Sequence, residues 1–171
     1  YAHYILAMSY YDSIIDEKKD LEPMTKSKEQ FELILTKFPE TDFAMDAKYK
    51  LDLINNFLAA KEMNIGRHYI EREKWIAAIN RFKNVTDNFE TTVYVEEALH
   101  RLVEIHYNIG LNVESEKYAN ILGYNYLSSE WYKKSYKVFN KDYKIKSIKI
   151  KKKKNNNKSI LKKLKSLING Q

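Results

Sequence analysis

The chain has 171 residues, of which 44% are hydrophobic, 4 are Gly and 2 are Pro, and this scarcity of turn-forming residues favours helices. The absence of Cys excludes disulfides, thiolate metal sites and thiol nucleophiles, and no apolar run reaches the length of about 18 residues that a membrane span needs. The formal net charge is +7, but residues 133–171 hold 15 Lys and one acid, so the rest of the chain is acidic.

Apolar residues recur at helical spacing along most of the chain, and no stretch alternates with the two-residue period of a strand. We predict a first helix from Tyr1 to about Asp16, followed by a charged loop that reaches Met24. A second helix is expected from Thr25 or the next residues. Pro39 ends it, because proline cannot continue a helix from within.

The middle of the chain predicts a long helix, capped by Thr41 or Asp42 and running from about 43 to 72, or roughly 45 Å at 1.5 Å per residue. Beyond a break near 72–74, further helices are expected at about 75–88, 92–110 and 113–125, and from Glu130 after a Ser129 cap. Helices of similar length joined by short turns indicate stacked hairpins. The predicted fold is therefore an all-α, tetratricopeptide-type repeat solenoid over residues 1–140, followed by a Lys/Asn-rich low-complexity tail over 141–171.

An internal repeat supports the solenoid. One residue pattern occurs three times, with shifts of 51 and then 37 residues; its copies are Phe31, Ile34, Phe38, Pro39, Thr41, Ala44, Ala47 and Leu51; then Phe82, Val85, Phe89, Thr92, Val95, Ala98 and Leu102; and, more weakly, Ala119, Leu122, Tyr126, Ser129 and Tyr132. Each hairpin leaves an apolar face for the next one to cover.

The middle unit matches the tetratricopeptide pattern. Gly66 and Ala78 let two helices approach closely, and Tyr69 and Phe82 fill the space between them. We expect the repeat residues to form a core and to perform no chemistry. This predicted packing set comprises Gly66, Tyr69, Ala78, Phe82, Phe31, Phe38, Pro39, Ala47 and Ala98.

The segments 60–70 and 77–82 resemble the BamD family of outer-membrane protein assembly factors, in particular its alphaproteobacterial form. Residues 38–41, 98–104 and 122–132 fit the same family, and the resemblance covers about residues 1–136. It is more specific than a generic repeat match, because the matched residues include polar ones that the repeat does not require. Glu90 and Leu127 depart from the pattern, since the family usually has Pro there.

This resemblance implies an array of about five repeats, of which the later three are present, with the first repeats and a lipid-anchored N-terminus expected upstream. It implies a lipoprotein at the periplasmic face of the outer membrane, in the machinery that inserts β-barrel proteins. The partners it implies are the periplasmic domains of BamA, other complex subunits and unfolded outer-membrane proteins. A periplasmic repeat adaptor of another envelope process, of the type that accompanies the Tol–Pal system, stays open as an alternative.

The sequence predicts no catalytic, cofactor-binding or metal-binding residues and therefore no enzyme, because its four His do not cluster and no nucleophile or phosphate-binding motif occurs. All four Arg lie in or next to the matched segments, and Arg is favoured at protein interfaces. The predicted partner-binding residues are Arg101, Glu104, Arg67 and Arg81, with the helix over 98–110 as the contact by family analogy. Pairing of the Arg residues with Glu62, Glu71 or Glu104 inside the chain is the alternative.

The basic tail contains a second helical pattern. After Ser159, apolar residues at 160, 161, 164, 167 and 168 alternate with Lys, which indicates an amphipathic helix. It could lie on an anionic lipid surface, dock on an acidic partner or the acidic body, or bind nothing. Nucleic-acid binding is disfavoured, because the Lys residues sit in one tail beside an acidic body and no aromatic residue interrupts the Lys run.

Overall fold

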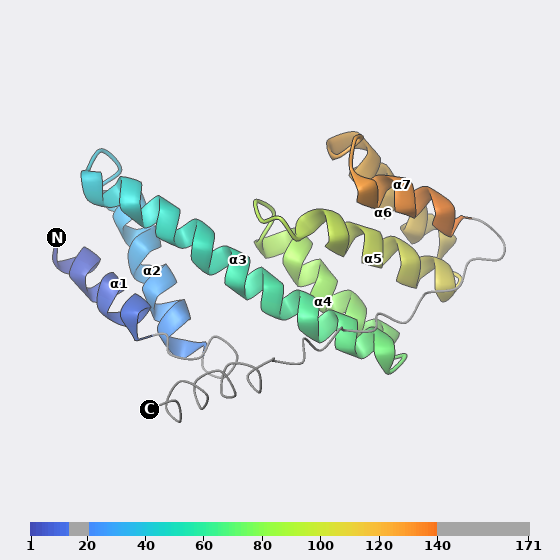
Figure 1. Cartoon of the computed structure of the whole chain (residues 1–171), viewed down its shortest axis with the longest axis horizontal. Coiled ribbons are helices and arrows are strands. Elements are labelled where there is room, and N and C mark those ends of the chain that lie inside the picture. Colours follow the sequence, from blue (N-terminus) through green and yellow to red (C-terminus); the bar gives the residue numbers. More distant parts are fainter. Residues whose placement is uncertain (14–20, 140–171) are drawn as a thin grey trace, which may run out of the picture.

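The computed structural model describes residues 1–13 and 21–139, and within these ranges it is all-helical (Figure 1). The helices are α1 (Ala2–Asp12), α2 (Glu22–Lys37), α3 (Asp42–Glu71), α4 (Trp75–Asn88), α5 (Val95–Asn108), α6 (Asn112–Asn125) and α7 (Glu130–Val138). The predicted helical-hairpin repeat fold is confirmed. The predicted tail and its amphipathic helix lie outside the described residues, as does the expected end of the first helix near Asp16.

The helices pack mainly against their neighbours in sequence. α1 packs with α2, α3 with α4 and α5 with α6, while α7 lies against both α5 and α6. In Figure 1, α3 runs diagonally through the molecule, with α1 and α2 beside its first half and α4 beside its second half. The result is a short array of hairpins in which α5 has helices on several sides.

Two apolar clusters stabilise this array, and α3 belongs to both of them. The first cluster joins α1, α2 and the first half of α3, where Leu51 and Ile54 are its last members. The second joins the remainder of α3, from Ala59 onward, to α4, α5 and α6. Because the clusters meet along one continuous helix, each half of the array holds the other in place.

The sequence repeat is also a repeat of backbone geometry. The turns Phe38–Thr41, Phe89–Thr92 and Tyr126–Ser129 follow α2, α4 and α6. In each turn the last residue donates its N–H to the carbonyl of the first, at 3.3, 3.0 and 3.0 Å. The first residue has a φ of −137°, −135° and −137° and a ψ of 51°, 38° and 47°. All three copies predicted from the sequence therefore close the same turn.

The turns inside the hairpins also match each other. The α5–α6 turn contains Gly110 with a φ of 84°, and the α3–α4 turn contains Glu73 with a φ of 56°. Glycine adopts this left-handed conformation freely, whereas for a residue with a Cβ it costs about 1–2 kcal/mol. Glu73 therefore occupies a position that favours glycine.

Two predicted helix starts are wrong by three residues. α2 begins at Glu22 rather than near Thr25, because Pro23 is accommodated in the first turn, where a missing N–H costs no hydrogen bond. α5 begins at Val95 rather than Thr92. The Thr92 hydroxyl donates to the Phe89 carbonyl at 2.8 Å and thereby closes the preceding turn instead of capping the helix.

Most of the predicted packing set is buried. A Cβ on Gly66 would lie 2.7 Å from the Phe82 ring, so the two helices approach as closely as they do because this residue is glycine. Tyr69 is partly buried against the second cluster. The members with 0% exposure are Phe31, Ala47, Ala78, Phe82 and Ala98.

Phe38 and Pro39 contradict the packing prediction. Phe38 is 48% exposed and Pro39 is also exposed. The equivalent Phe89 and Tyr126 pack against the second cluster. The turn at Phe38 lies at the edge of the described array in Figure 1, where no further described helix covers it.

Candidate partner-binding surfaces

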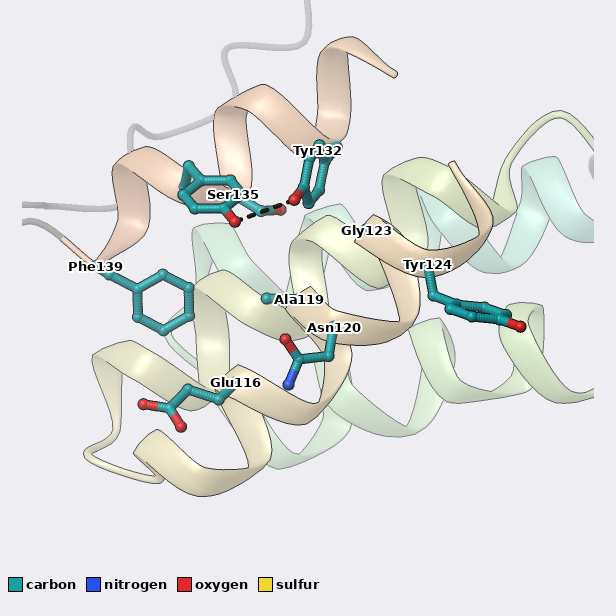
Figure 2. Close-up of a pocket in the computed structure, with 9 residues that line it drawn as sticks. Glu116, Ala119, Asn120, Gly123, Tyr124, Tyr132, Ser135 and Phe139 are labelled. Carbon is teal, nitrogen blue, oxygen red and sulfur yellow. Dashed lines mark hydrogen bonds between the residues drawn. The ribbon is translucent and has the colours of Figure 1, made fainter. Parts of the chain in front are cut away.

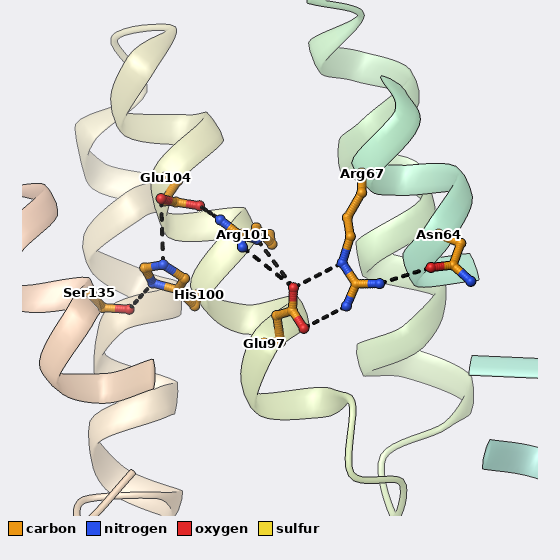
Figure 3. Close-up of polar contacts among 7 residues, drawn as sticks. All are labelled: Asn64, Arg67, Glu97, His100, Arg101, Glu104 and Ser135. Atoms are coloured by element: carbon orange, nitrogen blue, oxygen red, sulfur yellow. Dashed lines mark hydrogen bonds and ion pairs between the residues drawn. The ribbon is translucent and has the colours of Figure 1, made fainter. Parts of the chain in front are cut away.

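A chain of charged and polar side chains crosses the array from α3 to α7 (Figure 3). Arg67 of α3 forms a bidentate salt bridge with Glu97 of α5. Its Nε donates to Oε1 at 3.0 Å, and its Nη2 donates to Oε2 at 2.6 Å. The remaining Nη1 donates to Asn64 at 3.0 Å. The two charged side chains are only 18% and 13% exposed, so this pair is largely desolvated.

Arg101 continues the chain of contacts on α5. Its Nε lies 3.4 Å from Oε1 of Glu97, and its Nη1 donates to Glu104. The guanidinium also lies over the ring of Trp131 of α7, with 5.6 Å between them. Arg101 therefore connects two carboxylates of its own helix to an aromatic side chain of α7.

His100 completes the connection to α7. Its Nε2 lies 3.5 Å from Oε1 of Glu104, and its Nδ1 lies 2.9 Å from the hydroxyl of Ser135. His100 and Ser135 are 3% and 1% exposed. The network thus joins three helices through buried, hydrogen-bonded groups.

This geometry disagrees with the prediction that Arg101 and Glu104 are polar contact points for a partner. Their side chains are 12% and 3% exposed, because other helices cover this face of α5. Arg67 is also turned inward. Arg81 is more accessible, at 41%, although it pairs with Glu62 at 3.2 Å. The alternative of pairing inside the chain describes these contacts better.

Sequence reasoning missed Glu97, which joins two of the Arg residues. In the sequence, Glu97 is one of many carboxylates in helical segments, and such residues usually lie on the solvent-facing side of a helix. Its spacing of four residues from Arg101 was a usable signal for that pair. No local signal could indicate Arg67, which lies 30 residues away on a different hairpin.

An open groove runs along the second half of α3. Its volume is about 560 Å³, and residues that line it include Phe57, Lys61, Asn64, Ile65, His68 and Arg72. Phe57 is 40% exposed, so an aromatic ring is available at the surface. We call this feature the α3 groove. It combines apolar side chains with cationic ones, a composition that suits a protein partner.

A second groove lies between α6 and α7 (Figure 2) and has a volume of about 410 Å³. The residues that line this α6–α7 groove include Glu116, Ala119, Asn120, Gly123, Tyr132 and Phe139. A Cβ on Gly123 would lie 2.6 Å from the Tyr132 ring, so the glycine lets this ring approach α6. The Tyr132 hydroxyl donates to that of Tyr136 at 3.1 Å, and this bond raises the pKa of Tyr132.

The two buried histidines of the described ranges have structural contacts. Besides the His100 contacts, His106 has its Nδ1 2.7 Å from the Leu102 carbonyl, and its ring lies 5.2 Å from that of Tyr118. Within residues 1–13 and 21–139, no group of three or more His, Asp or Glu side chains is arranged to hold a metal ion. These contacts account for both imidazole rings as parts of the packed interior.

The helices of the described ranges include none that is both long and apolar enough to cross a membrane.

A family model described as YfiO, outer membrane lipoprotein, matches residues 1–121. The chain belongs to the YfiO family of outer membrane lipoproteins. The segments that suggested the resemblance, 60–70 and 77–82, lie within the matched range, and the predicted family is confirmed.

Curated relatives share the same printed name. The chain is 48% identical over 138 residues to the outer membrane protein assembly factor BamD of Rickettsia prowazekii, covering 81% of this chain and 55% of the relative. It is 39% identical over 140 residues to BamD of Caulobacter vibrioides, covering 82% and 46%. BamD of Vibrio cholerae is 28% identical over 107 residues, covering 63% and 44%. The chain spans about half the length of the curated relatives it matches.

Proposed function

We propose that the chain is a non-catalytic scaffold subunit of the outer-membrane β-barrel assembly complex, at the periplasmic face of the outer membrane. In this role it binds the periplasmic domains of BamA and other subunits, and helps to deliver unfolded outer-membrane proteins for insertion. The observation that supports this most is the 48% identity over 138 residues to an assembly factor BamD. The hairpin array adds support, because stacked helical repeats present extended surfaces to other proteins.

The α3 groove is the surface that we propose for the contact with BamA. Aromatic and Arg side chains are enriched where protein interfaces gain most of their free energy, and the groove offers Phe57, Tyr69 and Arg72. Arg81, on the neighbouring α4, remains a proposed contact, since its side chain is 41% exposed. Arg67, Arg101 and Glu104 would then act indirectly, by holding α5 against α3 and α7.

The test is calorimetric titration of the full chain with the purified periplasmic domains of BamA from the same organism. We expect saturable one-to-one binding. Arg72→Glu should weaken it at least about tenfold, because it reverses the charge of a side chain that lines the groove. Lys48→Glu is the matched control, since it makes the same charge change on an exposed position in the first half of α3. It should leave the affinity within about twofold.

Equal effects of the two variants would retain the partner and reject the α3 groove. No binding at tens of micromolar, from a chain whose circular dichroism shows it to be helical, would reject the assembly-complex proposal. It would favour the alternative of an adaptor in another envelope process.

A further inference from the structure

The α6–α7 groove forms an uncovered face at the C-terminal end of the described array. α5 is packed against α4, α6 and α7, whereas α6 and α7 pack mainly against α5 and each other among the described helices. The exposed aromatic side chains beside the groove, Tyr124 and Tyr136, are 91% and 67% exposed. Terminal units of repeat arrays usually have a polar outer face, whereas this one carries a groove lined by both apolar and polar side chains.

The rest of the chain begins at the rim of this groove. Phe139 is one of the lining residues, and residues 140–171 follow it directly. These residues lie outside the described part, and the sequence predicts a basic amphipathic helix over 159–168. The 19 residues from 140 to 158 can extend by about 3.3–3.6 Å each, far more than a return to the groove requires.

The one charged residue that lines the groove is opposite in sign to the lysine-rich segment. Among the described residues that line the groove, Glu116 is the charged one, and Asn120 and Ser135 add polar groups. α7 carries three lysines: Lys133 pairs with Glu130 at 2.8 Å, Lys134 lies over the Trp131 ring at 3.8 Å, and Lys137 is exposed. Residues 140–171 carry 12 Lys and one acid, so a segment with an apolar stripe between lysines fits this groove better than an acidic segment would.

We propose that the segment 159–168 docks as a helix in the α6–α7 groove of its own molecule. Its apolar stripe covers Ala119, Gly123 and Phe139, a lysine approaches Glu116, and its remaining lysines face water. Tethering through a 19-residue connection gives an effective concentration on the order of millimolar, so a weak contact is enough to keep the groove filled. The segment thereby covers the apolar part of the groove at the end of the described array. This proposal does not depend on which partner the α3 groove binds.

The test uses the absence of Cys from the chain. Ser166→Cys places a single thiol on the face opposite the apolar stripe, and a nitroxide attached there broadens the NMR signals of nearby amides. In the full-length ¹⁵N-labelled chain we expect selective broadening around Ala119, Gly123 and Ser135, with the amides of α1 and α2 unaffected. Leu161→Asp with Leu164→Asp should abolish the broadening. The control Lys162→Gln, on the polar face, should preserve it.

Two further measurements distinguish other occupants. In a mixture of nitroxide-labelled, unenriched chain with ¹⁵N-labelled, nitroxide-free chain, broadening at the same amides would show that the segment docks on a second copy. Absence of broadening in the labelled chain alone, with binding of the segment to vesicles that contain an anionic phospholipid, would assign it to a lipid surface. Either result, or uniform weak broadening over all helices, would overturn the proposal. Signal dispersion in the ¹H–¹⁵N spectrum verifies that each variant is folded.

Discussion

Arg67 and Glu97 are 30 residues apart in the sequence and form a two-pronged ion pair between α3 and α5. Removing one partner of a buried pair leaves the other charge without compensation. We expect Glu97→Gln to lower the free energy of unfolding by about 2–3 kcal/mol, since Glu97 also faces Arg101. Urea denaturation followed by circular dichroism measures the change.

The exposed Glu114 provides the control for this measurement, because Glu114→Gln removes the same charge from a helical residue that is open to solvent. A midpoint for Glu97→Gln equal to that of the control would show that the network adds no stability. In a double-mutant cycle with Arg67→Met, the coupling energy should exceed about 1 kcal/mol.

We expect even the smallest substitution at Gly66, Gly66→Ala, to destabilise the fold. In an ordinary helix interior, Gly→Ala stabilises by about 1 kcal/mol. Here the added Cβ would lie 2.7 Å from the ring of the fully buried Phe82, so we expect Gly66→Ala to destabilise by about 1–3 kcal/mol. Thermal unfolding of Gly66→Ala, and of the same variant combined with Phe82→Leu, tests the cause. If the close approach is responsible, Phe82→Leu costs less stability when it is combined with Gly66→Ala than when it is made alone.

Glu73 and Gly110 share a left-handed backbone conformation, and we expect substitutions at the two positions to change the free energy of unfolding in opposite directions. Glu73→Gly should raise the free energy of unfolding by about 0.5–1 kcal/mol, because the left-handed φ of 56° no longer opposes a Cβ. Gly110→Ala should lower it by about 1 kcal/mol, since its φ is 84° and nothing lies within 4 Å to add a clash. Chemical denaturation of both variants compares them, and a loss of stability for Glu73→Gly would contradict this account of the turn.

We expect the stabilising contribution of Tyr4 to be lost at alkaline pH. Its hydroxyl donates to Oδ2 of Asp46 at 2.8 Å, and this hydrogen bond raises the pKa of Tyr4 in the folded chain. A raised pKa means that the contribution is complete below the unfolded value of about 10 and is lost as the pH rises through the folded value. Tyr4→Phe keeps the ring contacts and should cost about 1 kcal/mol at neutral pH.

Denaturation curves for Tyr4→Phe and the unaltered chain between pH 7 and 11 measure this difference, which should shrink above about pH 10. Tyr49→Phe, at a residue that is 61% exposed, is the matched control. A difference that stays constant across this range would exclude the Asp46 hydrogen bond as its source.

The sequence was sufficient to predict the helices and the repeated turns, because both depend on local patterns. The three-to-four-residue spacing of apolar side chains located every described helix, and the aromatic-to-hydroxyl turn residues located the repeats. Errors occurred where a side chain had two compatible roles. Thr92 can cap a helix or close a turn, and Pro23 can end a loop or begin a helix.

The charged network could not be predicted in the same way. The prediction that Arg101 and Glu104 contact a partner was based on the general preference for Arg at interfaces and on family analogy, neither of which specifies how the helices pack. In the structure α7 packs on the side of α5 that carries them, and the two charged side chains contact each other, His100 and the Trp131 ring. Such an arrangement depends on which helices meet, and helix spacing in the sequence does not specify it.

The continuity of α3 has a mechanical consequence. This helix has 30 residues, about 45 Å at 1.5 Å per residue, and no break separates its part in the first cluster from its part in the second. Bending it between Ile54 and Ala59 would require breaking backbone hydrogen bonds. A rotation of α1 and α2 is therefore transmitted through α3 to α4 and α5. The orientation of a partner bound to the first group of helices then constrains the orientation of the second group.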